Sequence, residues 1–263
     1  MKYFYKAKKR LVLALVTLVG LVPNVYSQDT VTVFAASSLT NALTDIADSY
    51  QATHDTKIRL SFASSSALAR QVEYGAPADI YFPANQKWLD YVIEKQAVDA
   101  KSRVTLLTNR LVLIAPNGSA LAANPSIESE PGSSLLDLLA GGRLALGDPA
   151  HVPVGQYAKQ ALYYYQQWDE LEPQLARANN VRGALVLVER GESPLGIVYQ
   201  TDAEVSTKVA QIATFPVESH SPIEYPMVMV SEKPSKSAMQ FYQYLQSEEA
   251  RVVFEQYGFG VNQ

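Results

Sequence analysis

The sequence contains no cysteine, which excludes disulfide bonds, thiolate metal sites and cysteine nucleophiles. It has only three histidines, His54, His151 and His220, and they lie too far apart in the chain to predict a zinc site. No Walker A loop, G-x-G-x-x-G segment or G-x-S-x-G motif is present. These absences argue against nucleotide binding and against a serine hydrolase, which needs a nucleophile, a base and a group that orients the base. We therefore expect a protein that is not an enzyme.

Apolar runs long enough to cross a membrane are also missing. The first 27 residues combine a basic stretch, an apolar run from Leu11 to Val22 and a break at Pro23. Val25 and Ser27 then fit the minus-three and minus-one positions of a cleavage site, so this segment is typical of a secretory signal peptide. Its apolar run is shorter than the roughly 20 residues of a membrane-spanning helix. We expect residues 1–27 to be removed and, without cysteine, no lipid anchor.

Positive charge is scarce once that segment is set aside. Residues 1–27 carry five positive charges and no negative ones, so without them the formal net charge falls from −4 to −9. Because nucleic-acid binding depends on clustered Lys and Arg, an acidic chain is a poor candidate for it. Export without an anchor favours a soluble protein confined to a periplasm, with no nucleic-acid partner.

The remaining sequence alternates between strand and helix patterns. Strands are predicted at residues 30–36, 57–63, 79–82, 110–115, 143–146, 195–199 and 225–230, and helices at 39–50, 67–74, 86–95, 155–166, 168–178, 181–190, 236–246 and 248–257. This order predicts an α/β fold with parallel sheets covered by helices. The length fits two lobes joined by crossing strands. We expect residues 28–110 and 224–263 to form one lobe and residues 111–223 the other.

Serines follow the first two predicted strands directly. Ser37 and Ser38 come after the first, and Ser64, Ser65 and Ser66 come after the second, each time at the start of a helix. Hydroxyl groups beside the free N–H groups of a helix N-terminus can bind an anion without a cationic side chain. Serine is also a favoured helix N-cap. Two clusters in equivalent positions leave both interpretations open.

Three further groups follow later strands. The loop 147–155 joins a strand to a helix, with the N–H groups near Val154 facing the same end of a sheet. Asn180 precedes Val181 as the cap of another helix, and Tyr199 ends a strand. Taken singly, each of these residues favours a structural role over a functional one.

Six stretches in the chain resemble the periplasmic molybdate-binding proteins of ABC uptake systems. They are VTVFAASSLTNAL (31–43), SFASSSALARQ (61–71), GAPADI (75–80), GDP (147–149) with HVP (151–153), VRGAL (181–185) and PLGIVY (194–199). They keep their order and cover nearly the whole chain after the signal segment. The resemblance implies a type II periplasmic binding protein fold, with two lobes, crossing hinge strands and a ligand held between the lobes by hydrogen bonds alone.

The resemblance also implies the residues of the site. Ser38 and Ser65 would donate their hydroxyl protons from one lobe; from the other, Val154 and Val181 would contribute backbone N–H groups and Tyr199 its hydroxyl. Ser37 and Val154 stand where the family commonly has alanine. A backbone donor tolerates the side-chain change at Val154, whereas Ser37 leaves open which serine of the first pair faces the ligand. The ligand would be molybdate or tungstate with no cofactor, and the partners would be the permease and ATPase subunits of a transporter, with the protein itself a monomer.

Donors alone suit a fully deprotonated tetrahedral dianion, because such an ion only accepts hydrogen bonds. A protonated phosphate would bring a proton that finds no acceptor. Sulfate differs mainly in size, so the preference for molybdate rests on the resemblance, and a sulfate or other small-oxyanion receptor remains the alternative. A secreted hydrolase that uses one of the clustered serines, and a sensor domain that signals through a partner, are less favoured.

Overall fold

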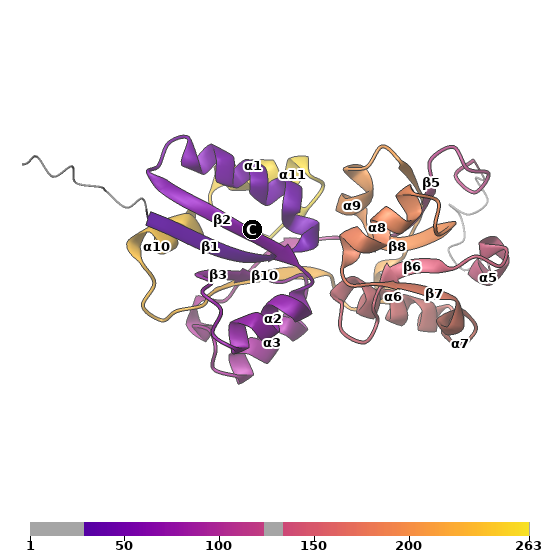
Figure 1. Cartoon of the computed structure of the whole chain (residues 1–263), viewed down its shortest axis with the longest axis horizontal. Helices are drawn as coiled ribbons and strands as arrows, with labels where there is room; N and C mark the ends of the chain where they lie inside the picture. The colour runs from indigo at the N-terminus through magenta and orange to yellow at the C-terminus, as the bar shows by residue number, and fades with distance from the viewer. Residues whose placement is uncertain (1–28, 124–133, 263) are drawn as a thin grey trace, which may run out of the picture.

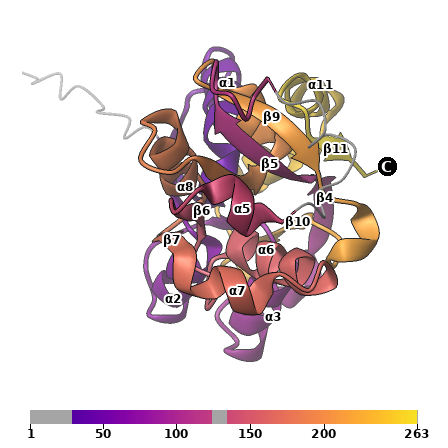
Figure 2. The same cartoon turned by 90° about the vertical axis from the view of Figure 1, so that its right-hand side faces the viewer.

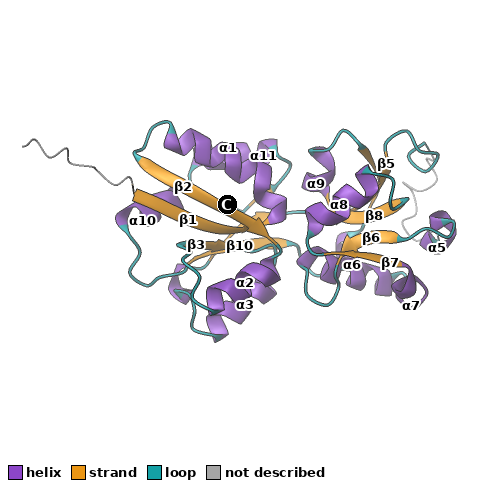
Figure 3. Cartoon of the chain, in the orientation of Figure 1, coloured by secondary structure: helices purple, strands orange, loops and turns teal. Residues whose placement is uncertain are grey.

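A computed structural model describes residues 29–123 and 134–262 of the chain, so the predicted signal peptide lies outside the described residues. The chain forms two lobes side by side, each built on one β-sheet with helices on both faces (Figure 1). Figure 3 shows the same division by secondary structure, with strands inside each lobe and helices outside. The predicted two-lobed α/β fold is therefore confirmed.

Six strands make up the sheet of the first lobe, in the order β11-β4-β10-β3-β1-β2. Their bounds are β1 (Asp29–Ala36), β2 (Thr56–Ala63), β3 (Ile80–Phe82), β4 (Val104–Thr108), β10 (Glu224–Met229) and β11 (Gly260–Val261). β1 pairs in parallel with both β2 and β3, whereas β10 is antiparallel to β3 and β4. The N-terminal part of the chain thus gives a parallel core of β1, β2 and β3, which the antiparallel strands β10, β4 and β11 extend.

The sheet of the second lobe has the order β7-β6-β8-β5-β9. Its strands are β5 (Leu111–Pro116), β6 (Leu144–Gly147), β7 (Leu175–Ala178), β8 (Leu195–Tyr199) and β9 (Val209–Thr214). β6 is parallel to β7 and β8, while β5 is antiparallel to β8 and β9. The chain crosses between the sheets twice, from β4 to β5 and from β9 to β10.

Helices cover both faces of each sheet, and Figure 2 shows the second lobe end on. The helices are α1 (Thr40–Gln51), α2 (Ser65–Glu73), α3 (Gln86–Glu94), α5 (Leu135–Leu139), α6 (Pro153–Tyr164), α7 (Trp168–Leu171), α8 (Val181–Glu189), α9 (Gln200–Glu204), α10 (Lys236–Tyr244) and α11 (Glu248–Gln256). Short 3-10 turns are η1 (Ser37–Leu39), η2 (Ala100–Ser102), η3 (Glu172–Gln174) and η4 (Val217–Ser219). In the first lobe α1 and α11 lie on one side of the sheet and α2 and α3 on the other (Figure 1).

The apolar patterns of the sequence follow from this layering. Residues 111–115 of β5 are all buried, as expected for a strand covered on both faces. α1 instead buries one stripe, Ala42, Leu43, Ile46, Ala47 and Tyr50, at helical spacing. None of the helices in the described part of the chain has the length and apolar character needed to cross a membrane.

One predicted element is wrong. The sequence predicted a helix over residues 168–178, but α7 ends at Leu171, and Pro173 lies in the short turn that leads into β7. Proline at this point cannot donate the hydrogen bond that would continue the helix. Two prominent strands, β4 and β9, were also not predicted, and neither were the short elements α5, α9 and β11. Gly191 follows α8 directly with φ 68°, the left-handed conformation that glycine favours just past a helix end.

Candidate functional site

A small cavity lies between the lobes, where the first turns of η1, α2, α6 and α8 meet. Its free volume is only about 10 Å³, far below the roughly 300–1,000 Å³ of clefts that hold drug-sized ligands. The lining residues are Ala36, Ser37, Ser38, Ala63, Ser64, Ser65, Ala84, Val152, Pro153, Val154, Val181 and Tyr199. The cavity is therefore far too small for a drug-sized ligand.

Strand register explains why these helix starts converge. In the first lobe β1 and β2 run in parallel, and their last residues, Ala36 and Ala63, are paired. The serines that follow them are thus side by side at one edge of the sheet. In the second lobe the last residues of β6 and β7, Gly147 and Ala178, are paired in the same way. The helices that follow these two strands, α6 and α8, present their N-termini to the serines of the first lobe.

The serines at the cavity in the first lobe have different hydrogen-bonding partners. Ser64 is the N-cap of α2, and its Oγ accepts from the N–H of Ala67. Ser65 Oγ accepts from the Ala84 N–H at 2.9 Å, which leaves the Ser65 proton free to donate. Ser38 Oγ lies 3.0 Å from the Tyr225 hydroxyl. Ser38 and Ser65 are only 2% and 1% exposed, so a proton donated into the cavity does not compete with bulk water.

Backbone N–H groups face the cavity from the second lobe. Val154 is the second residue of α6, and Val181 is the first residue of α8, where Asn180 caps the helix through the N–H of Gly183. N–H groups in the first turn have no partner within their helix, so those of Val154 and Val181 are available to a ligand. Gly155 keeps α6 close to β6, because a Cβ there would lie 1.9 Å from the Gly147 carbonyl oxygen.

Tyr199 completes the cavity at the end of β8. The residue is 1% exposed, and its hydroxyl has no hydrogen-bond partner among the described residues. Burial raises the pKa of Tyr199 well above its usual value, so the hydroxyl remains a proton donor at neutral pH. A buried hydroxyl without a partner costs stability, and one that lines a cavity is available to hydrogen-bond a ligand there.

Among the residues that the structure describes, no lysine or arginine lines the cavity. The nearest guanidinium in sequence belongs to Arg182, beside Val181, and its Nε lies 2.5 Å from a carboxylate oxygen of Asp202. Asp202 is fully buried, and its burial raises its pKa to about 6, although Arg182 opposes the shift. The described residues contain no cluster of His, Asp and Glu that could hold a metal ion. The arrangement can therefore hold an anion with neutral donors, and the adjacent cation is already paired.

Contacts across the cleft hold the lobes together around this cavity. The Trp88 indole N–H donates to the His151 carbonyl at 2.8 Å, and His151 Nδ1 lies 2.9 Å from Ser66 Oγ. Ser66 and His151 would be two members of a hydrolytic triad, but no carboxylate in the described part of the chain hydrogen-bonds to the histidine. The carboxylate of Asp148 instead accepts from the Ala150 N–H. This geometry supports closure of the cleft and not catalysis.

All five residues that the resemblance implied, Ser38, Ser65, Val154, Val181 and Tyr199, line this one cavity. That they bind the ligand stays a prediction. Sequence reasoning missed the groups that contact the cavity serines: Tyr225, which lies beside Ser38 and accepts from Asn109, and Ala84, whose N–H donates to Ser65. No local sequence pattern identifies these partners, because they come from distant parts of the chain.

Residues 31–260 match the family model of the bacterial extracellular solute-binding proteins. The chain is 50% identical over 231 residues to the molybdate-binding protein ModA of Escherichia coli (strain K12), a match covering 88% of this chain and 89% of that protein. It is 46% identical over 230 residues to ModA of Haemophilus influenzae, covering 87% and 89%. Among solved structures, the periplasmic molybdate-binding protein of Azotobacter vinelandii is similar in fold, with a TM-score of 0.75 at 20% identity over 89% of this chain and all of that one.

Proposed function

The chain belongs to the bacterial extracellular solute-binding proteins, and from this premise we propose that it binds molybdate and delivers it to an ABC permease for uptake. The high identity to the two ModA proteins supports this function over its alternatives. The chain is a binding protein and not an enzyme, and molybdate is its ligand and not a cofactor. The observation that carries the proposal is the cavity itself, which is lined by donors and contains a buried Tyr199 hydroxyl that no described residue hydrogen-bonds.

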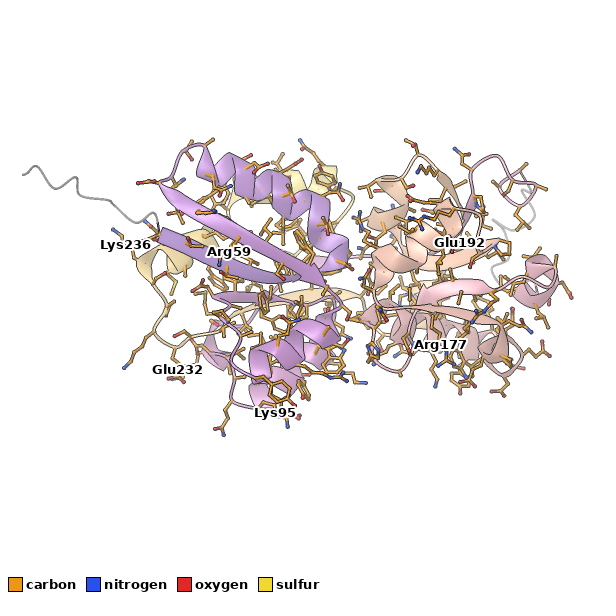
Figure 4. The ribbon with its side chains drawn as sticks, in the orientation of Figure 1. Arg59, Lys95, Arg177, Glu192, Glu232 and Lys236 are labelled. Carbon is orange, nitrogen blue, oxygen red and sulfur yellow. The ribbon has the colours of Figure 1, made fainter. Side chains whose placement is uncertain are left out.

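In the proposed site, the hydroxyls of Ser38, Ser65 and Tyr199 and the N–H groups of Val154 and Val181 donate to the four oxygens of the oxyanion. Every one of these groups can donate, and each hydrogen bond to a charged ligand contributes about 1.5–3 kcal/mol. The helix N-termini add partial positive charge without bringing a counter-ion. Figure 4 labels Arg59, Lys95 and Arg177, which are exposed on the outsides of the lobes, away from the cleft. Tungstate, with the same charge and shape, fits the same donors.

Ligand binding would couple to transport through closure. Because the donors come from both lobes, the ligand stabilises the closed arrangement, which a permease can distinguish from the open one. We propose that residues 28–110 with 224–263 and residues 111–223 move as the two lobes. We also propose that residues 1–27 direct export to the periplasm and are then removed, and that the protein acts there as a monomer without a lipid anchor or a nucleic-acid partner.

Calorimetry with molybdate, tungstate, sulfate and phosphate tests the function directly. We expect tight binding of molybdate and tungstate, and a loss of about 10–100-fold in affinity for Ser38→Ala or Ser65→Ala, from about 1.5–3 kcal/mol per lost hydrogen bond. Ser193→Ala is the matched control, because this serine is fully buried but lies outside the cavity lining. Tight sulfate binding without molybdate binding would instead favour a sulfate receptor.

A further inference from the structure

Asp202 is a buried carboxylate near the cavity that the proposed site does not use. It is the third residue of α9, the helix that starts directly after Tyr199, and it is 0% exposed. Its Oδ1 accepts from Arg182 Nε at 2.5 Å, whereas its Oδ2 has no hydrogen-bond partner among the described residues. A buried carboxylate with one unpaired oxygen is costly in its charged form, because burial removes it from water.

Arg182 connects this carboxylate to both walls of the cavity. It follows Val181, whose N–H faces the cavity at the start of α8, and it lines a narrow gap together with the cavity residue Ser38. With Asp202 ionised, the pair has no net charge. With a proton on Asp202, the pair carries the full positive charge of Arg182, because a guanidinium does not lose its proton in proteins.

The charge of Asp202 acts on hydroxyl groups at the cavity. Burial is the main cause of the raised pKa of Tyr199 and of Tyr225, and the negative charge of Asp202 adds to both shifts. Tyr199 lines the cavity, and the Tyr225 hydroxyl lies 3.0 Å from Ser38 Oγ. A dianion held by these residues would therefore repel the carboxylate of Asp202 through a poorly screened interior.

The other titratable groups around Asp202 do not change charge in the same way. Burial raises the pKa of the three nearby tyrosines, so that they stay neutral: Tyr157 of α6, Tyr199 of β8 and Tyr225 of β10. β5 and β9, which pack against α9, carry no titratable side chain. Glu189 of α8 hydrogen-bonds to Ser206, and Glu204 of α9 is exposed. Burial raises the pKa of Asp202 itself to about 6, although Arg182 and a hydrogen bond from the Tyr199 backbone oppose the shift.

We propose that the protein binds its oxyanion together with one proton, which is taken up from the solvent by Asp202, and that the ion pair with Arg182 thereby gains a positive charge beside the bound dianion. The inference rests on the proposed function and adds a proton as a second ligand. Because the dianion repels the carboxylate, the complex holds this proton more tightly than the empty protein does. By linkage, the affinity for the dianion rises as the pH falls.

Calorimetry of the unmodified protein with molybdate tests the coupling without any substitution. Titrations at about pH 7 in buffers with different enthalpies of ionisation give the number of protons taken up per bound ion. We expect about 0.5–1 proton, and an affinity about tenfold higher at pH 6 than at pH 8, a range over which molybdate itself remains a dianion. Binding without proton uptake at pH 7 would refute the inference.

Asp202→Asn assigns the proton to this residue. The substitution keeps an oxygen that can accept from Arg182 Nε but removes the titratable carboxylate. We expect proton uptake to vanish, the affinity to become nearly independent of pH, and binding at about pH 8 to be at least about tenfold tighter than in the unmodified protein. Proton uptake that persists in this variant would place the proton on another group and contradict the assignment.

Glu204→Gln is the matched control, because Glu204 lies on the same helix but is exposed and hydrogen-bonds to Gln200. We expect this variant to keep the proton uptake of the unmodified protein, and its loss would count against Asp202. If Asp202→Asn does not fold, infrared spectroscopy of the unmodified protein decides, because molybdate must then create the signal of a protonated carboxyl group. If molybdate binds without a proton, only this inference fails. If the unmodified protein binds no molybdate at any pH, the proposed function itself fails.

Discussion

Replacing Tyr199 by phenylalanine should strengthen or preserve the empty protein while it weakens the complex. The hydroxyl of Tyr199 is buried in the cavity wall without a partner among the described residues. The ring would keep its edge-on contacts with Tyr157 and Tyr225, at centroid distances of 6.4 Å and 6.0 Å. The variant therefore changes one hydrogen-bonding group and little else.

The two effects have opposite signs and can be estimated separately. A buried polar group without a partner costs about 1–3 kcal/mol, so its removal should leave the free energy of unfolding of the empty protein equal or higher. In the complex, the same hydroxyl would donate to the anion. Its loss should cost about 1.5–3 kcal/mol, or about 10–100-fold in affinity.

Two assays measure these quantities on the same samples. Denaturant unfolding without ligand gives the stability, and calorimetry with molybdate gives the dissociation constant. Tyr50→Phe is the control, because the Tyr50 hydroxyl is also buried without a partner in the described structure but lies outside the cavity lining. An unchanged molybdate affinity in Tyr199→Phe, or a clear loss of stability without ligand, would refute the reasoning.

Two further predictions concern the surroundings of the cavity. Folding raises the pKa of Asp202 from 3.8 to about 6. As the pH falls from 6 to 4, the folded protein therefore binds a proton at Asp202 that the unfolded chain does not bind. This proton binding stabilises the folded protein against acid unfolding. Asp202→Asn should therefore lose about 1–3 kcal/mol more stability than the unmodified protein between pH 7 and 4, measured by urea unfolding; parallel pH profiles would contradict this. Trp88 contacts His151 across the cleft, so its fluorescence should report closure of the lobes. A molybdate-induced change in tryptophan fluorescence should disappear in Trp88→Phe and persist in Trp168→Phe. The reverse pattern would place the motion elsewhere.

The fold was largely predictable because most of its helices and strands have a recognisable local sequence pattern. β1, α1, β8 and α8 carry clear periodic patterns, and their observed bounds differ from the predicted ones by a residue or two at most. The region after Trp168 was mispredicted because its apolar residues fit a helix as well as a turn followed by the strand β7, and only Pro173 distinguishes the two. β9 is an edge strand with a mixed burial pattern, which gives only a weak signal.

The cavity was predictable for a different reason. The serines after β1 and β2 lie at paired strand ends, so parallel pairing alone brings them together. That Val154 and Val181 face these serines depends on how the two lobes meet, and here only the family resemblance gave the prediction. The hydrogen bonds behind the cavity depend on contacts such as Ser38 with Tyr225, 187 residues apart, which no local pattern contains.

A crystal structure of the protein with bound molybdate tests the central claim most directly. Anomalous scattering from molybdenum would locate the ion. We predict it in the cavity between the lobes, with its oxygens within hydrogen-bond distance of Ser38, Ser65, Val154, Val181 and Tyr199 and with Arg182 still paired to Asp202. Molybdenum elsewhere in the protein, or oxygens contacted by a lysine or arginine side chain, would contradict a site built from neutral donors.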